Sequence, residues 1–139
     1  MIRATHRSRG LTLVETLVAV AVTGVLASVA LPSYRGAQLR GQRVDATSSL
    51  QELQREQETY RERHGGYADK LEQLPGFAAG RSLQGRYRLV LQGSADGLAY
   101  TATAIADGAQ AADTDCSEVT LRIDGALSFQ GPDARCWQS

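Results

Sequence analysis

The sequence predicts an α+β protein: a long N-terminal helix, whose first half is suited to crossing a membrane, packed on an antiparallel sheet of three or four strands. Helical periodicity extends over roughly residues 12–64. Three runs of alternating apolar and polar residues, joined by short turns, follow it. An almost uninterrupted apolar run over residues 11–31 has the length of a membrane-spanning helix. The 139 residues suffice for one globular domain.

The apolar run allows three interpretations. It follows ten residues with three arginines and no acid, and it holds a single charge, Glu15. A removable signal peptide would be cut after the small residues that end at Ala30. A buried core helix and a retained membrane helix of about 31 Å are the other two. The acid inside the run, and helical periodicity that continues past it, favour the retained helix.

The second half of the predicted helix is amphipathic. Apolar residues and one glutamine recur at spacings of three and four, while the other faces carry Gln, Glu and Arg. His64 followed by two glycines predicts the end of the helix. The face that should pack on the sheet consists of Ala46, Leu50, Leu53, Gln57 and Tyr60.

The remainder of the chain predicts the sheet. A loop over residues 67–84 shows no sustained period and contains a short turn of helix near Asp69–Gln73. Short connections between the strands that follow make neighbouring strands antiparallel. The alternating runs lie at about 87–92, 100–106 and 119–124, with a short fourth strand at 126–129.

A polar loop at residues 107–115 carries several acids. Carboxylates are the oxygen ligands that calcium prefers, but their spacing here matches no EF-hand loop. We therefore interpret them as a solvated acidic loop rather than a metal site. The acids are Asp107, Asp113, Asp115 and the neighbouring Glu118.

Composition argues against catalysis. The 15 basic and 15 acidic residues cancel, so the chain offers no global charge for nucleic acid or a membrane surface. A zinc site would need both histidines and both cysteines to converge. A catalytic triad could use only His64, which lies in a charged helical stretch. We therefore expect no enzyme activity, no cofactor and no metal.

Cys116 and Cys136 are the only cysteines. A disulfide between them would stabilise the fold by about 3 kcal/mol in the chain-entropy model and would fasten the last strand and the C-terminal tail. Two free buried thiols are the alternative. A lone cysteine pair in a small domain suits an oxidising compartment. Because arginines are equally frequent on both sides of the apolar run, this pair decides the expected orientation, with the C-terminal part outside the inner membrane.

Three arginines lie close together around the first predicted strand: Arg81, Arg86 and Arg88, with Tyr87 among them. Such a basic and aromatic group is one way to contact DNA. A solvated strand face is the simpler interpretation, which we favour.

The residues Arg9 to Glu15, RGLTLVE, and the apolar run up to Pro32 resemble the N-terminus of a type IV prepilin. The family pattern is a short basic leader that ends in Gly, followed by a hydrophobic residue, Thr, two hydrophobic residues and Glu. Leu11 stands where Phe or Met is common. The motif covers residues 9–34, and the predicted organisation of the rest of the chain resembles the pilin fold.

The resemblance implies that a prepilin peptidase cuts between Gly10 and Leu11 and that the new amine is N-methylated. It also implies that Glu15 pairs with the N-terminal amine of a neighbouring subunit during filament assembly. A cation and an anion in an apolar environment are each costly alone and tolerable together. The alternative is that Glu15 only reaches the lipid headgroups. The expected parts are a leader (1–10), a transmembrane and polymerisation helix (11–34) and a periplasmic or extracellular domain (35–139).

Three glycines and a proline interrupt the helical pattern: Gly24, Pro32, Gly36 and Gly41. Glycine costs about 1 kcal/mol and proline about 3 kcal/mol in a helix interior. These residues either kink the helix or, as the resemblance to pilins suggests, let it bend or unwind when the subunit leaves the bilayer and packs in a filament.

The sequence thus favours a structural subunit, most similar to a small minor pilin with a C-terminal disulfide loop. It would wait in the inner membrane, then join other pilin subunits in a helical filament through the inner-membrane assembly machinery, and serve twitching motility or adhesion. The alternatives are a DNA-binding pilin for natural transformation, a type II secretion pseudopilin, which usually lacks the disulfide, and a secreted protein cut after Ala30.

Overall fold

The computed structural model describes residues 12–138, which divide into two compact units, up to Arg35 and from Gly36 onwards. The elements in chain order are α1 (Leu13–Gln42), α2 (Val44–His64), η1 (Leu71–Gln73), β1 (Tyr87–Gly93), β2 (Ala99–Ala106), η2 (Gly108–Ala112), η3 (Thr114–Cys116), β3 (Glu118–Asp124), β4 (Leu127–Gly131) and α3 (Ala134–Trp137).

Helix α1 begins directly after Thr12, whose hydroxyl oxygen accepts a hydrogen bond from the backbone N–H of Glu15 at 3.2 Å. This bond satisfies one of the N–H groups that a helix start leaves without a partner. From Leu13 to Gln42 the helix buries no residue. Together with α2 it forms one helical stretch of 52 residues, which is long and apolar enough to cross a membrane.

The break in this helical stretch lies at Arg43, not at the glycines or the proline. Helix α1 continues through Pro32, whereas the backbone N–H of Arg43 bonds to the carbonyl of Arg40, at 3.1 Å, instead of the carbonyl one residue earlier. Helix α2 ends where the sequence predicted. Gly65 has a φ of 82° and its N–H bonds to the carbonyl of Arg61 at 2.8 Å, an ending that glycine adopts without steric cost.

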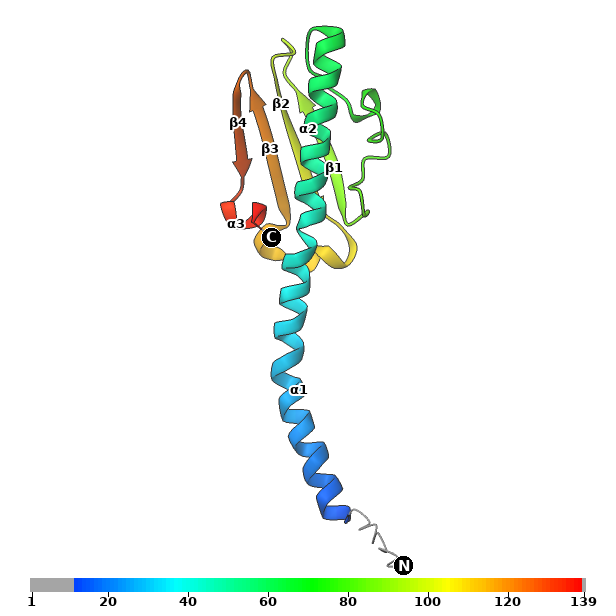
Figure 1. Cartoon of the computed structure of the whole chain (residues 1–139), viewed down its shortest axis with the longest axis vertical. Coiled ribbons are helices and arrows are strands. Elements are labelled where there is room, and N and C mark those ends of the chain that lie inside the picture. Colours follow the sequence, from blue (N-terminus) through cyan, green and yellow to red (C-terminus); the bar gives the residue numbers. More distant parts are fainter. Residues whose placement is uncertain (1–11, 139) are drawn as a thin grey trace, which may run out of the picture. The chain divides into compact units, whose positions relative to one another are not determined.

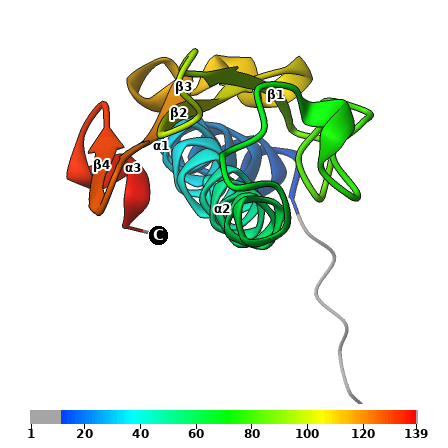
Figure 2. The ribbon, with the colours of Figure 1, turned by 90° about the horizontal axis from the view of Figure 1, so that it is seen from above.

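Within the described residues, a four-stranded antiparallel sheet has the order β1-β2-β3-β4. Figure 1 shows the four strands side by side with α2 across them, and Figure 2 shows α2 end-on against one face. The predicted α+β class and antiparallel sheet are therefore confirmed. The sequence analysis did not predict the short helices η2, η3 and α3, which cluster at one end of the sheet (Figure 1).

The core lies between α2 and the sheet. The residues of α2 at the predicted spacing supply one side, and alternate residues of β1, β2 and β3 supply the other. Tyr87 and Tyr100 are the largest side chains enclosed there. Burial raises the pKa of both phenols, so both stay neutral well above neutral pH.

The two edges of the sheet differ. The segment before β1 folds back along it, since Arg81 pairs with Arg88 and the N–H of Leu89 bonds to the carbonyl of Gly80 at 2.8 Å. In β4 the first four side chains are exposed, and within residues 12–138 no strand covers its outer edge. The β1 edge is therefore closed by its own chain, and it is the edge that carries the arginines.

Candidate functional site

Two of the residues expected to function, Gly10 and Leu11, lie outside the described residues. Glu15 lies in the first turn of α1 with its side chain exposed, and its carboxylate makes no ion pair within residues 12–138. The backbone N–H of Glu15 bonds to the Thr12 hydroxyl, and a Thr followed three residues later by Glu is the pattern of a helix N-terminal cap. Thr12 and Glu15 therefore also mark the start of the helix.

The apolar side chains of α1 are exposed on every side of the helix. Leu13 is 76% exposed, Val29 is 73% exposed, and the other large apolar residues of the helix up to Tyr34 are also more than half exposed. A helix that is apolar on every face needs lipid or other helices around it. Gly24, Pro32, Gly36 and Gly41 all lie within α1, and their predicted flexibility stays a prediction.

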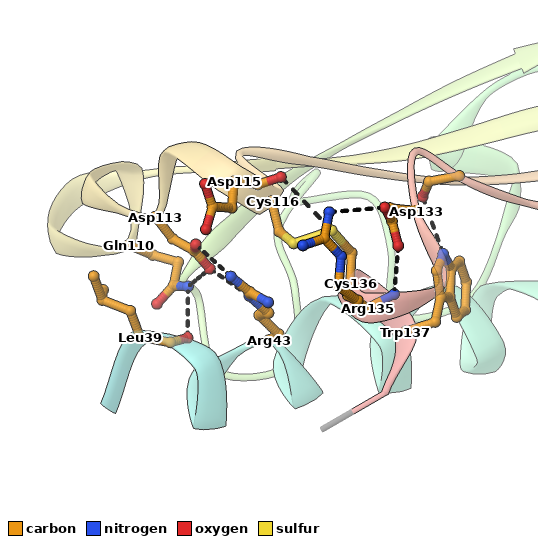
Figure 3. Close-up of a disulfide and its surroundings, with 11 residues drawn as sticks. Leu39, Arg43, Gln110, Asp113, Asp115, Cys116, Asp133, Arg135, Cys136 and Trp137 are labelled. Carbon is orange, nitrogen blue, oxygen red and sulfur yellow. Dashed lines mark hydrogen bonds and ion pairs between the residues drawn. A yellow bond between two sulfur atoms is a disulfide. The ribbon is translucent and has the colours of Figure 1, made fainter. Parts of the chain in front are cut away.

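The junction between α1 and α2 is held by a buried ion pair that the sequence analysis missed. The guanidinium of Arg43 donates two hydrogen bonds to the carboxylate of Asp113, at 2.6 and 2.7 Å, and both side chains are less than a tenth exposed. These bonds raise the pKa of Arg43. Figure 3 shows the Arg43 side chain reaching from the helix junction to Asp113 in the loop at the end of the sheet.

Gln110 completes this junction. Its side-chain amide N–H donates to the carbonyl of Leu39 at 3.1 Å and to Asp113 at 3.3 Å (Figure 3). The carbonyl of Leu39 needs a partner because the break at Arg43 takes away its usual helical donor. The interpretation of the acids as a solvated loop was therefore wrong for Asp113, which burial and the pairing with Arg43 make part of the fold.

The predicted disulfide between Cys116 and Cys136 is present, with 5.6 Å between the two Cα atoms. It joins η3 to α3, and both cysteines are buried (Figure 3). The indole N–H of Trp137 donates to the carbonyl of Gly131 at 3.0 Å and so fastens α3 to the end of β4. The C-terminal tail is thus tied to the sheet at two points.

The three arginines named by the sequence do come together, at the covered edge of the sheet. Arg81 faces Arg88 across an isolated β-bridge, and Arg86 borders, with Arg81, a pocket of about 340 Å³. We call Arg81, Arg86 and Arg88 the arginine cluster. Asp107 opposes it, because its carboxylate accepts a hydrogen bond from the Arg81 guanidinium at 2.7 Å. That bond lowers the pKa of Asp107, so the acid stays ionised at neutral pH.

The turn next to the arginine cluster is bound by Asp45, a buried acid in the first turn of α2. Its carboxylate accepts hydrogen bonds from the Ser82 hydroxyl at 2.6 Å, the Gln84 N–H at 2.8 Å and the Arg86 N–H at 3.2 Å. The turn between Arg81 and Arg86 is therefore attached to the helix by three hydrogen bonds. The sequence contains little sign of this role of Asp45. An acid beside the packing face is common in the first turn of any helix, where it interacts favourably with the helix dipole.

Comparison with known proteins decides the family. The family model described as "Type IV minor pilin ComP, DNA uptake sequence receptor" matches residues 32–120, more than half of the chain. The chain belongs to this family of type IV minor pilins. The model described as "Prokaryotic N-terminal methylation motif" matches residues 5–31 of this pilin, the region that contains the prepilin-like motif. The predicted resemblance to type IV pilins is confirmed.

A curated relative of this pilin is the "Type IV major pilin protein PilA" of Myxococcus xanthus (strain DK1622), with 32% identity over 87 residues. The alignment covers 63% of this chain and 39% of that relative. It therefore spans well under two thirds of the relative's length.

Proposed function

We propose that this pilin is a structural subunit, of the minor type, in a type IV pilus. The observation that carries the proposal is the exposed apolar helix α1, which begins with the methylation-motif sequence and buries no side chain of its own. Such a helix is stable in a bilayer or inside a bundle of equivalent helices. A filament results when one contact between copies repeats without closing into a ring.

In this proposal a prepilin peptidase removes residues 1–10, and the subunit waits in the inner membrane with its domain on the periplasmic side. The inner-membrane assembly machinery then transfers it into a filament with other pilins, for twitching motility or adhesion. The disulfide supports the periplasmic side, because such bonds persist in oxidising compartments. The mass of the protein isolated from its host tests processing: a chain that starts at Leu11 is expected, and one that starts at Met1 contradicts it.

Glu15→Val tests the assembly step. We expect the variant to insert into the membrane at least as well as the wild type, because the apolar run loses a charge. Incorporation into filaments should fall sharply, because the amine of the neighbouring subunit loses its partner. The measurement is the ratio of pilin in sheared filaments to pilin in membranes.

Two controls sharpen this test. Thr16→Val changes the adjacent exposed residue from polar to apolar and should leave incorporation unchanged. Glu15→Gln keeps the shape and removes the charge, so it should behave like Glu15→Val. Normal incorporation of Glu15→Val at equal expression would refute the pairing role.

A second candidate function is DNA binding. It is supported by two observations: the matching family model is described as a DNA uptake sequence receptor, and the arginine cluster flanks a turn that is hydrogen-bonded to Asp45. Against it, Asp107 neutralises Arg81, and the chain carries no net charge. We rank it below the structural function.

Salt dependence separates the two functions. If the arginine cluster neutralises three phosphates, log affinity should fall with log salt at a slope of about −2.7, since each contact contributes about −0.9. Replacing Arg81, Arg86 and Arg88 with Ala should then abolish binding to duplex DNA. The matched control replaces Arg55, Arg61 and Arg63 of α2, which removes the same charge elsewhere. Binding no tighter than about 10⁻⁴ M, or equal losses in both triple variants, would exclude specific use of the cluster.

A further inference from the structure

A second pocket lies beside the disulfide, at the end of the domain where α1 enters it. It measures about 300 Å³ and, besides the cysteines, is lined by charged residues of both signs and by one glutamine. These are Arg40, Arg43, Asp115, Asp133, Arg135 and Gln138. The structural roles described above account for the cysteines and for Arg43, but not for the others.

Most of the charges in this pocket have partners. Arg43 is bound by Asp113, and the Arg135 guanidinium donates to Asp133 at 3.0 Å, which lowers the pKa of Asp133. Arg40 and Asp115 differ: within residues 12–138 neither side chain takes part in a hydrogen bond or ion pair. Two opposite charges thus line one pocket without meeting each other. A ligand that carries both signs, placed between them, would satisfy both.

The position of Arg40 in the chain suggests where such a ligand comes from. Arg40 follows Leu31, the last residue of the apolar run, by nine residues, about 13.5 Å along a helix. The headgroup layer on each side of a bilayer adds several ångströms to a hydrocarbon core about 30 Å thick. The long side chain of Arg40 can extend back toward the bilayer over the remaining distance. A pocket that includes Arg40 is therefore within reach of lipid headgroups whenever α1 spans the membrane.

We propose that this pocket binds a zwitterionic phospholipid headgroup, with the phosphate at Arg40 and Arg135 and the ammonium at Asp115. The proposal rests on the proposed membrane-anchored state before assembly. Guanidinium groups donate several hydrogen bonds to phosphate oxygens, and a carboxylate accepts them from a primary ammonium. The bound headgroup would hold the domain against the membrane until the subunit is withdrawn into a filament.

The chemistry of the ammonium makes the proposal specific. An ethanolamine headgroup carries a primary ammonium that donates hydrogen bonds, whereas a choline headgroup carries a methylated ammonium that donates none. The carboxylate of Asp115 should therefore favour ethanolamine lipids over choline lipids. Without Asp115 the pocket would retain only its phosphate contacts, and the preference should disappear.

The chain contains its own reporter. Trp137, the only tryptophan, lies in α3 between Cys136 and Gln138, two residues that line the pocket. The experiment places the full chain in choline-lipid nanodiscs with increasing fractions of ethanolamine lipid and follows Trp137 emission. Soluble phosphoethanolamine, added to the chain in detergent without ethanolamine lipid, tests whether the free headgroup is sufficient. We expect a saturable change in Trp137 emission with either one.

Variants decide the assignment. Arg40→Gln should raise the concentration of soluble phosphoethanolamine at half-maximal change roughly threefold to tenfold, the loss of one partly exposed charge-assisted hydrogen bond to the phosphate. Asp115→Asn should make ethanolamine and choline lipids equivalent. Arg55→Gln, on the exposed face of α2 and paired with Glu52, should change nothing. All three positions are exposed, so the variants should keep the fold, which formation of the disulfide verifies.

The outcomes separate the inference from the proposed function. If Trp137 emission does not change with the fraction of ethanolamine lipid, the inference is overturned. It is also overturned by an Arg40→Gln variant that titrates like the wild type, or by a lipid preference that Asp115→Asn retains. A chain that fails to insert into nanodiscs contradicts the membrane-anchored state itself, and the response of Trp137 to phosphoethanolamine alone then tests the pocket independently.

Discussion

Helices α1 and α2 follow one another with only Arg43 between them, yet they have opposite relations to the rest of the molecule. Helix α1 buries none of its residues, whereas α2 buries seven of its residues against the sheet and its flanking loops. The backbone hydrogen bonding is the same in both. The difference lies in the side chains: up to Tyr34 α1 is apolar on every face, whereas α2 is apolar on one. Helical structure by itself therefore does not show what stabilises a helix. Helix α2 is stabilised by packing on its own domain, whereas α1 requires surroundings that the single chain does not supply.

The largest effect should come from the point where the two helices meet. Asp113→Ala leaves the Arg43 guanidinium buried without its partner, so we expect a loss of about 3–5 kcal/mol in the free energy of unfolding. Denaturant unfolding of the full chain in detergent, followed by Trp137 fluorescence, measures it. The control is Asp124→Ala, which breaks the exposed Arg122–Asp124 ion pair of the same chemistry and should leave unfolding almost unchanged. Equal effects of the two variants would mean that burial does not distinguish these pairs.

The second prediction tests the core contacts of α2 directly. Leu50 is fully buried, and Leu50→Ala should cost about 2–5 kcal/mol through lost burial and the cavity that remains. Leu17→Ala removes the same atoms from α1, where the side chain is 60% exposed, and should leave domain unfolding unchanged. A loss for Leu17→Ala similar to that for Leu50→Ala would contradict the contrast between the helices.

The third prediction concerns the disulfide, which lies next to the loop whose residues Gln110 and Asp113 bind the start of α2. Cys116→Ser should lower domain stability by about 3 kcal/mol, because Cys116 fastens α3 and ends the segment that carries Gln110 and Asp113. Non-reducing peptide mapping verifies the bond in the wild type, and denaturant unfolding measures the loss. Ser117→Ala, beside it and exposed, serves as the control. Wild-type stability in Cys116→Ser would show that the tail is held by Trp137 and its neighbours alone.

The smallest effect is expected inside α1. At Gly24 an added Cβ would meet no atom within 4 Å among the described residues, so Gly24→Ala should fit without strain. It should strengthen the helix by about 1 kcal/mol at most and leave domain unfolding as it is. Backbone hydrogen exchange of the chain in nanodiscs measures the change. If the glycine serves flexibility during assembly, the same variant should also incorporate into filaments less well, whereas unchanged incorporation would contradict that role.

Much of this protein could be predicted from local sequence because its signals are local. The spacing of Ala46, Leu50 and Leu53 placed the packing face of α2, and all three are fully buried. Alternation placed β1, β2 and β3 to within a residue or two. The resemblance of residues 9–15 and the apolar run after them to the prepilin motif predicted the family, which the comparisons confirmed. A period of 3.6 residues in a helix, or of 2 residues in a strand, indicates directly which side of the element faces the core.

Other features depended on residues far apart in the chain, which no local period reports. Arg43 and Asp113 are 70 residues apart, and Asp45 is 37 or more residues from the turn that it binds. Both acids resemble ordinary surface acids in sequence. Their roles exist only because the fold brings a helix junction against a loop and buries both partners, where an unpaired charge would be too costly to keep. The sequence by itself therefore determined the long helices, the four strands, an apolar run long enough to span a membrane and the cysteine pair. The tertiary structure alone decided which charges became part of the interior and which remained on the surface.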